Sequence, residues 1–219
     1  MSEEVNIRRA AALETATLSD ALDRLGIQSQ CNGIAPRSPG FRMAGRARTI
    51  LYGPAGDPPG SVGDYIDEIA AGEIVVLDNG GRTDATVWGD ILTEVALNRG
   101  IAGTLIDGVC RDVALCRELS YPVFSKGHWM RTGKDRVQVV GADVPVTIGT
   151  VRVCPGDLIV GDADGVIVIP RAKEDAVLDA AEEIHQVESR IREDVRGGMR
   201  LEVARRSHGY HDLQSRRAS

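Results

Sequence analysis

The sequence is poor in aromatic residues, in basic clusters and in long apolar runs. Only 4% of its 219 residues are aromatic, and 26 Lys and Arg face 32 Asp and Glu, for a formal charge of −6. An acidic chain with scattered basic residues lacks the electrostatic footprint of a nucleic-acid-binding protein. No apolar run approaches the roughly 20 residues of a membrane helix. We therefore expect neither a nucleic-acid partner nor a membrane.

Cysteine is also sparse, and its spacing indicates no disulfide or zinc framework. The four cysteines, Cys31, Cys110, Cys116 and Cys154, include no C-x-x-C pair. Residues 1–9 are polar and charged rather than apolar, which predicts no secretory signal. We therefore expect reduced thiols and a cytoplasmic location. A chain of this length can bury a sufficient core without disulfides.

Nucleotide-binding motifs are absent from the glycine-rich segments. Residues 53–63 lack the Gly-Lys-Ser/Thr ending of a P-loop, and no G-x-G-x-x-G opens a helix after a strand. Elsewhere, helix-like and strand-like patterns alternate, which predicts parallel strands joined by crossover helices. The predicted helices cover residues 17–25, 64–70, 90–99 and 112–119. The predicted strands between them cover residues 74–77, 104–106 and 123–124.

The pattern changes beyond residue 137. Short β segments are predicted over residues 137–140, 144–148, 151–153, 158–160 and 166–169, the last two forming a hairpin around an Asp-Gly turn. An apolar stripe then predicts a long charged helix over residues 171–196. We therefore expect an α/β fold with a single domain over residues 1–170, followed by a helical C-terminal arm and tail over residues 171–219.

Acidic residues follow two of the predicted strands. Gly89-Asp90-Ile91-Leu92 opens one helix, and Arg111-Asp112 opens the next. The carboxyl ends of neighbouring parallel strands meet at one crevice, where ligands bind in open α/β sheets. If the two strands are neighbours, Asp90, Arg111 and Asp112 converge, although twenty residues separate Asp90 from Arg111.

Such a cluster suits a 2-oxo acid. The unpaired amides of Ile91 and Leu92 at a helix N-terminus can hold a carboxylate or enolate oxygen. Arg111 offers a planar fork of donors for a second oxygen. Asp112 offers a hard oxygen ligand for Mg²⁺ or Mn²⁺, which need only one or two protein carboxylates. The alternative is that Asp90 and Asp112 simply cap their helices, with Arg111 in a solvated ion pair.

A longer set of short motifs resembles the RraA-like family. The resemblance covers about residues 17–170, and an Asp followed after twenty residues by Arg-Asp matches in full. The family includes divalent-metal-dependent pyruvate aldolases for 4-hydroxy-4-methyl-2-oxoglutarate and 4-carboxy-4-hydroxy-2-oxoadipate, and also the regulator of ribonuclease activity A. The matching motifs are Gly89-Asp90-Ile91-Leu92, Ala102-Gly103, Ile106-Asp107-Gly108, Arg111-Asp112, Tyr121-Pro122-Val123-Phe124, Val144-Pro145-Val146, Val153, Pro155-Gly156-Asp157 and Asp162-Ala163-Asp164-Gly165-Val166.

The resemblance implies a fold, an assembly and a set of roles. The fold would be an α-β-β-α sandwich of the swivelling-domain type, assembled as a homotrimer or homohexamer with active sites between subunits. Asp112 matches the metal ligand and Arg111 the pyruvyl-binding residue, beside the substrate-binding Gly89, Ile91 and Leu92. Asp90 matches an acidic residue that acts through water at the metal, and the regulator is understood to lack it.

Further along, the resemblance implies a glutamate on the C-terminal helix of a neighbouring subunit that orders the water around the metal. Glu188 is our candidate, ahead of Glu182, Glu183 and Glu193, and the alternative is a solvated helix charge. The whole pattern predicts a Mg²⁺- or Mn²⁺-dependent lyase that releases pyruvate from a 4-hydroxy-2-oxo acid and can also decarboxylate oxaloacetate. The alternatives are a non-catalytic regulator that binds a ribonuclease or another protein, and a lyase for sugar-derived 2-oxo acids.

Five further residues are weaker candidates. His208 and His211 have a metal-like spacing but no third ligand nearby. His128 either lines the substrate cleft or is a loop histidine with a surface partner. Arg82 is a candidate for binding a distal carboxylate of the substrate. Cys110 lies beside Arg111, but we expect a buried packing residue rather than a nucleophile.

Overall fold

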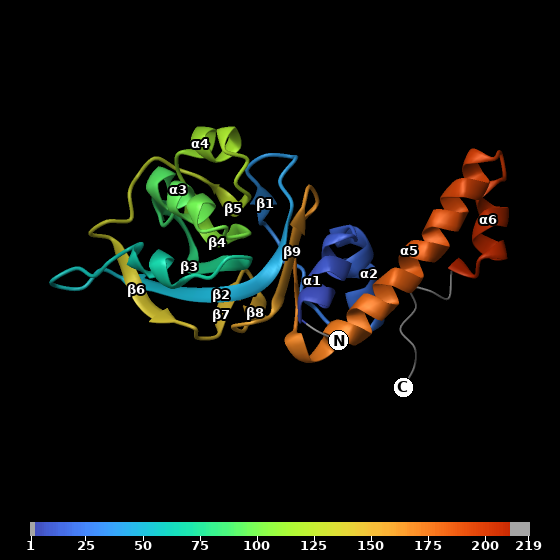
Figure 1. Ribbon diagram of the computed structural model, residues 1–219, viewed down its shortest axis with the longest axis horizontal. Coiled ribbons are helices and arrows are strands. Elements are labelled where there is room, and N and C mark those ends of the chain that lie inside the picture. The colour runs from blue at the N-terminus through green and yellow to red at the C-terminus, as the bar shows by residue number, and fades with distance from the viewer. Residues whose placement is uncertain (1–2, 211–219) are drawn as a thin grey trace.

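The protein is built on one curved mixed sheet with helices at both ends (Figure 1). The structure, a computed structural model, describes residues 3–210. Strands β2 to β5 run parallel, whereas β1, β6, β9 and β10 pair antiparallel at the margins. In the order β1–β5–β4–β3–β2–β9–β10, with β6 also paired to β2, the strands are Ala35–Pro36, Val123–His128, Gly103–Cys110, Glu73–Thr86, Met43–Pro54, Leu158–Asp162, Gly165–Ile169 and Val137–Ala142.

A separate hairpin and the helices complete the layers. The hairpin consists of β7 (Val146–Ile148) and β8 (Val151–Val153). The α-helices are α1 (Glu3–Ala11), α2 (Thr15–Arg24), α3 (Asp90–Asn98), α4 (Val113–Glu118), α5 (Glu174–Arg196) and α6 (Leu201–Ser207), and the 3₁₀ turns are η1 (Asp64–Glu68) and η2 (Arg171–Lys173).

Three apolar clusters hold these layers together. One face of β3 and β4 packs under α3 and α4, and the opposite face packs on β7, β8 and the inner side of β9 and β10. The outer side of β9 and β10 packs on α1, α2 and α5. The layer order is therefore helix, strand, strand, helix. This confirms the α/β fold that the sequence pattern predicts and the α-β-β-α arrangement that the family resemblance implies.

The central strands are longer than their sequence pattern indicates. The segment predicted over residues 74–77 is β3, which has 14 residues and continues through Asp78-Asn79-Gly80-Gly81. Gly80 and Gly81 have positive φ, and the pairing of β3 with β4 changes register there. The glycines therefore bend the strand instead of ending it. In the same way β5 extends to His128, well beyond the predicted residues 123–124.

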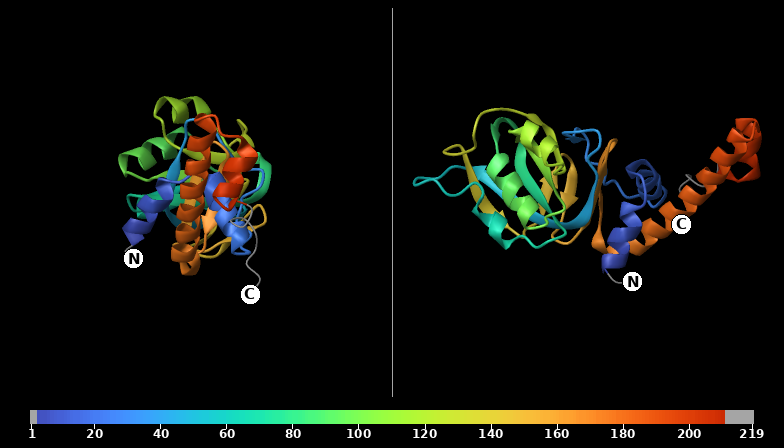
Figure 2. Two further views of the ribbon diagram at one scale, coloured as in Figure 1. Left: turned by 90° about the vertical axis from the view of Figure 1, so that its right-hand side faces the viewer. Right: turned by 45° about the horizontal axis from the view of Figure 1, so that its top comes forward.

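The C-terminal helix is present and begins beside the sheet. Arg46 of β2 donates to the buried carboxylate of Glu174, the first residue of α5. Val177, Leu178 and Ile184 bury the first half of α5 against α1 and α2. The second half projects away from the sheet and carries α6 at its end (Figures 1 and 2). Within residues 3–210, no helix has both the length and the apolar character needed to cross a bilayer.

Candidate active site

The two strand-to-helix junctions that carry the predicted residues lie next to each other. Strands β3 and β4 are parallel neighbours, so the start of α3 and the start of α4 meet at one edge of the sheet. The backbone amide of Asp90 donates to Oδ2 of Asp112 over 3.1 Å. Nε of Arg111 lies 3.2 Å from the same oxygen. The structure thus brings Asp90, Arg111 and Asp112 together, as the strand-junction argument predicts.

Asp112 occupies an unusual backbone conformation. Its φ of 54° and ψ of 36° are left-handed, a region that Asp tolerates better than most residues but that still costs about 1 kcal/mol. Asp112 stands at the N-cap of α4, yet its side chain makes no capping bond there. The carboxylate crosses to the start of α3 instead. Simple capping of its own helix, the alternative from the sequence, is therefore wrong for Asp112.

Arg111 is fixed by its backbone and open at its tip. Its amide donates to the carbonyl of Trp88 over 3.0 Å, which ties the end of β4 to the β3–α3 junction. Only Nε engages Asp112, and the Arg111 side chain is 39% exposed. Among residues 3–210, neither terminal guanidinium nitrogen has a partner. The open fork of Arg111 is suited to a carboxylate.

Gly89 contributes to the site because it has no side chain. A Cβ at this position would lie 2.7 Å from Oδ2 of Asp112 and 3.1 Å from Nε of Arg111. Real Cβ atoms do not approach other atoms so closely, so any larger residue would push the Arg111–Asp112 pair away. Its φ of −160° is ordinary extended backbone. Gly89 is therefore required for close approach rather than for its backbone flexibility.

A buried aromatic residue locks the first turn of α3. Nε1 of Trp88 donates to the hydroxyl of Thr93 over 3.0 Å, and that hydroxyl donates to the carbonyl of Gly89 over 2.8 Å. The ring of Trp88 stacks on Tyr121, with centroids 5.9 Å apart. Trp88 and Thr93 were not among the residues predicted for the site. A tryptophan directly before Gly89, in a chain with two tryptophans, was the available signal.

The helix start is only partly open. The amide of Ile91 donates to the carboxylate of Asp90 over 2.8 Å, so one of the two predicted oxygen-binding amides is engaged within its own helix. The Leu92 amide is the other. The carboxylate of Asp90 therefore accepts a hydrogen bond from its own helix, in line with the capping alternative, while its backbone amide binds Asp112 and so joins the cluster. The side chain of Ile91 is 71% exposed at the rim.

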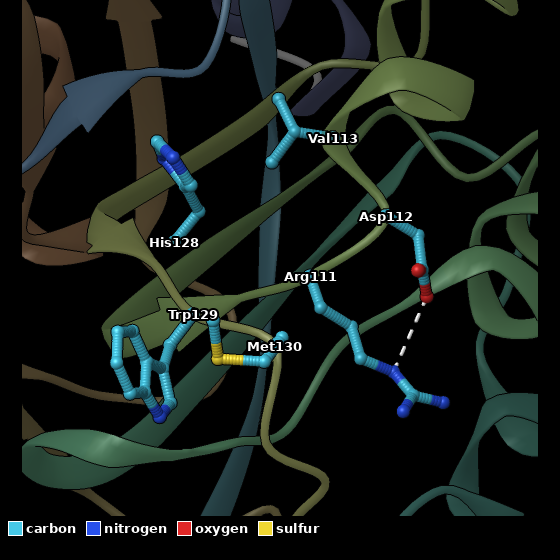
Figure 3. A pocket seen from close by; sticks show the side chains of 6 residues that line it. All are labelled: Arg111, Asp112, Val113, His128, Trp129 and Met130. Carbon is cyan, nitrogen blue, oxygen red and sulfur yellow. Dashed lines mark ion pairs between the residues drawn. The ribbon is translucent and has the colours of Figure 1, made fainter.

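Two cavities flank Arg111. The larger has a volume of about 440 Å³ and is lined by Arg111, Asp112, Val113, His128, Trp129 and Met130 (Figure 3). The smaller, of about 240 Å³, includes Asp90, Ile91 and Leu92 in its lining. His128 ends β5 and is among the residues that line the larger cavity. Trp129 and Met130 were not among the predicted site residues.

The donor set fits a hydrated hard cation. Oδ1 of Asp112 receives no hydrogen bond from the described part of the chain, while Oδ2 is held by two nitrogens. In residues 3–210, no three His, Cys, Asp or Glu side chains gather as a cage. Structural and catalytic zinc sites use three or four protein ligands, whereas Mg²⁺ binds through one or two carboxylates and keeps several waters. Asp112 therefore suits Mg²⁺ or Mn²⁺ better than Zn²⁺.

The predicted glutamate lies elsewhere in the chain. Glu188 is on the projecting half of α5 and sits 3.5 Å from Arg192 of the same helix, far from the β3–β4 edge (Figure 1). Glu182 and Glu183 are paired with Arg9 and Arg24 of the N-terminal helices. Within one subunit Glu188 cannot reach Asp112.

The histidine and arginine candidates outside the cluster have local partners. The guanidinium of Arg82 donates two hydrogen bonds of 2.9 Å to the carboxylate of Asp84. Nε2 of His208 lies 2.7 Å from the carboxylate of Asp194. His211, the second half of the predicted metal spacing, lies outside the described residues.

Cys110 is a packing residue, as expected. It is fully buried, and burial raises the pKa of its thiol to about 11, although a hydrogen bond with Ser125 works in the other direction. Burial likewise raises the pKa of Cys31 to about 12. Burial therefore favours the protonated thiol in both residues, which disfavours a nucleophilic role.

Comparisons with curated proteins place the chain among known relatives. The chain is 39% identical to protein DlpA of Legionella pneumophila over 199 residues. The matched region covers 90% of this chain and 32% of DlpA. It thus spans about a third of that relative's length. It is 35% identical over 175 residues to a Halalkalibacterium halodurans protein with the provisional name 4-hydroxy-4-methyl-2-oxoglutarate aldolase, covering 80% of this chain and 81% of the relative.

Solved structures and a family match agree with these relatives. An uncharacterized protein from Pseudomonas syringae has a TM-score of 0.87 and 42% identity, over 92% of this chain and 97% of its own. RraAS2 of Streptomyces coelicolor, described as an unusual member of the RNase ES inhibitor RraA family, has a TM-score of 0.77 and 30% identity, over 84% and 93%. Residues 15–168 match the family described as RraA-like: Aldolase/RraA. The chain therefore belongs to the RraA-like family.

Proposed function

We propose that the protein is a divalent-metal-dependent lyase that cleaves a 4-hydroxy-2-oxo acid to pyruvate and a second oxo compound. One observation carries the proposal: an open guanidinium fork and an open carboxylate oxygen, on Arg111 and Asp112, meet the start of α3 at one edge of the sheet. The pair is more than a third exposed, and such pairs add little to stability. The provisional aldolase names of relatives support the same reaction class.

The residues would divide the work between binding and proton transfer. The terminal nitrogens of Arg111 bind the substrate carboxylate, and the Leu92 amide at the positive end of α3 stabilises the enolate oxygen. Asp112 would hold Mg²⁺ or Mn²⁺, which supplies Lewis-acid polarisation of the 2-oxo group when bound. Asp90 takes the proton of the C4 hydroxyl through water. The C3–C4 bond then breaks, and C3 of the enolate regains a proton to give pyruvate.

The same proposal includes an assembly. Glu188 cannot reach Asp112 of its own chain, so its role in ordering water at the site requires a neighbouring copy, in a homotrimer or homohexamer. The projecting half of α5 supports this, because it extends beyond the helices that cover its first half. A Glu188→Gln variant that keeps full activity would remove this residue from the proposal without affecting the rest.

A second candidate is a regulator that binds a ribonuclease. The likeness to RraAS2, described as belonging to an RNase ES inhibitor family, favours it. Asp90 favours the enzyme, because the family resemblance matches it to the acidic residue that acts through water at the metal, which the regulator is understood to lack.

The test is pyruvate release with a coupled lactate dehydrogenase assay. With Mg²⁺, the purified protein should release pyruvate from 4-hydroxy-4-methyl-2-oxoglutarate or from oxaloacetate. EDTA should abolish the release, and added Mg²⁺ or Mn²⁺ should restore it. Turnover that persists in EDTA contradicts the metal requirement. An absence of pyruvate together with inhibition of a ribonuclease would favour the regulator.

A further inference from the structure

We propose that the 440 Å³ cavity is the subsite for the group carried on C4 of the substrate, and that it selects an uncharged aromatic or bulky apolar group through Trp129 and Met130. The inference rests on the proposed function and specifies its substrate class. That class differs from the dicarboxylic acid in the names of the relatives. Figure 3 shows the two side chains at the cavity beside Arg111.

Position supports the assignment. Arg111 and Asp112 line the cavity together with Val113, Trp129 and Met130, so the cavity begins where the pyruvyl end is anchored. A substrate held by its carboxylate at Arg111 has two flanking spaces of the same subunit open to its C4 group. The smaller space contains the start of α3, which is needed for the enolate oxygen. The larger space is therefore available for the leaving half.

The backbone segment that carries the exposed apolar side chains is held by hydrogen bonds on both sides. Trp129 is 45% exposed and Met130 is 70% exposed. The amide of Trp129 donates to the carbonyl of Cys110 over 2.9 Å. Two residues further on, the carbonyl of Arg131 accepts from both the amide and the hydroxyl of Thr86, over 3.0 and 3.1 Å. A fixed backbone that presents a large ring and a thioether to a cavity is typical of a ligand site.

The charges in the lining of the cavity determine which kind of C4 group it can accept. A second substrate carboxylate would need its own cation, because Arg111 is used by the first. In the lining, the imidazole of His128 is the remaining group able to carry positive charge. A carboxylate placed against Val113, Trp129 and Met130 loses hydration without gaining a comparable partner. A phenyl or branched alkyl group instead buries apolar surface against the ring and the thioether.

The reaction needs no further reactant with such a substrate. For 4-hydroxy-2-oxo-4-phenylbutanoate, the C4 hydroxyl loses its proton, the C3–C4 bond breaks, and its electron pair forms the enolate. A proton then returns to C3. The products are pyruvate and benzaldehyde, so atoms and electrons balance.

Binding is tested first, without turnover. Two 2,4-dioxo acids that have no C4 hydroxyl are titrated calorimetrically in the presence of Mg²⁺: 2,4-dioxo-4-phenylbutanoate and 2,4-dioxopentanedioate. We expect the phenyl compound to bind about 10-fold more tightly or better, the size of one good aromatic contact. In Trp129→Ala this preference should fall about 10-fold. Leu97→Ala is the matched control, because Leu97 has the same 45% exposure outside both cavities, and it should keep the preference.

Turnover is tested next, by the ratio of kcat/KM for 4-hydroxy-2-oxo-4-phenylbutanoate to that for 4-hydroxy-2-oxopentanedioate. The ratio should exceed about 10 and should fall in Trp129→Ala and Met130→Ala. Faster release from the dicarboxylate, with a ratio that Trp129→Ala leaves unchanged, overturns the subsite while the lyase stands. Tight phenyl binding that depends on Trp129, with no pyruvate from either acid, overturns the lyase while the subsite stands.

Discussion

Two acid–base pairs stand close together in the chain and differ in their surroundings. Asp107 is 5% exposed and has Nζ of Lys126 at 2.7 Å from its Oδ1, off the direction of a hydrogen bond, so the contact is a plain ion pair. Asp112, five positions later, has a side chain that is 37% exposed and shares one oxygen between Arg111 and an amide. The first pair neutralises a buried charge. Within the part of the chain that the structure describes, the second leaves donors and an acceptor unused.

The difference distinguishes a charged pair that the fold needs for stability from a charged pair that is available to bind a ligand. A buried carboxylate must be paired for the fold to persist, since an unpaired charge in the interior costs several kcal/mol. An exposed pair has no such obligation and adds at most about 1 kcal/mol. The unused groups of Arg111 and Asp112 are therefore better explained by a ligand than by stability. Substitutions in the Arg111–Asp112 pair should therefore lower activity, whereas substitutions in the Asp107–Lys126 pair should lower stability.

The largest expected effect is on activity at the open pair. Arg111→Ala or Asp112→Asn should lower kcat/KM for pyruvate release by roughly 100-fold or more, the scale for losing an electrostatic anchor. The midpoint of thermal unfolding should move by only a few degrees, because both side chains are more than a third exposed. Kinetics and a thermal melt on the same preparations check this, and wild-type rates in both variants would end the assignment of the site.

The buried pair should show the opposite pattern. Asp107→Asn leaves the ammonium of Lys126 without its counter-charge, and we expect the free energy of unfolding to fall by about 2 kcal/mol, below the value for a fully buried pair because Lys126 is 29% exposed. Urea unfolding followed by circular dichroism measures it. The double variant Asp107→Asn/Lys126→Met should regain part of the loss. A variant as stable as the wild type would show that the pair is not structural.

A smaller effect is expected at Gly89, which lies against the open pair Arg111–Asp112. In Gly89→Ala the new methyl group overlaps the carboxylate of Asp112 and moves it. We expect kcat/KM to fall about 10-fold, since small misplacements of reacting groups are costly. Gly40→Ala is a suitable control, because a Cβ there meets no atom within 4 Å. Equal rates in the two variants would show that the close approach is not needed.

The smallest effect concerns a second buried acid, Asp162. Burial acts to raise its pKa, but hydrogen bonds from Thr15 and from the Asp164 amide outweigh this and hold the pKa below its usual value. Its contribution to stability is therefore complete above the unfolded pKa of about 4 and is lost as the pH falls through the folded value. Asp162→Asn should be about 1 kcal/mol less stable at pH 6 and should approach the wild type at pH 3. A difference that persists unchanged at pH 3 would contradict this.

The sequence predicted parallel strands joined by crossover helices, and the convergence of Asp90 with Arg111-Asp112 followed only if the two junction strands were neighbours. Strands β3 and β4 meet that condition. The sequence predicted the extent of the strands less well. Gly80 and Gly81 signal a turn locally, but pairing with β4 carries the strand through them. Trp129 and Met130 were missed for the same reason, since only the extension of β5 to His128 brings them to the cavity.

The left-handed backbone of Asp112 has a consequence for how this position can vary. A residue at this position must supply a charged oxygen and must also tolerate the left-handed backbone conformation. Aspartate meets both requirements. Asparagine tolerates the conformation but carries no charge, whereas glutamate carries the charge but adopts the conformation less readily. Substituting the two amino acids in turn therefore separates electrostatics from shape at a single locus of the molecule.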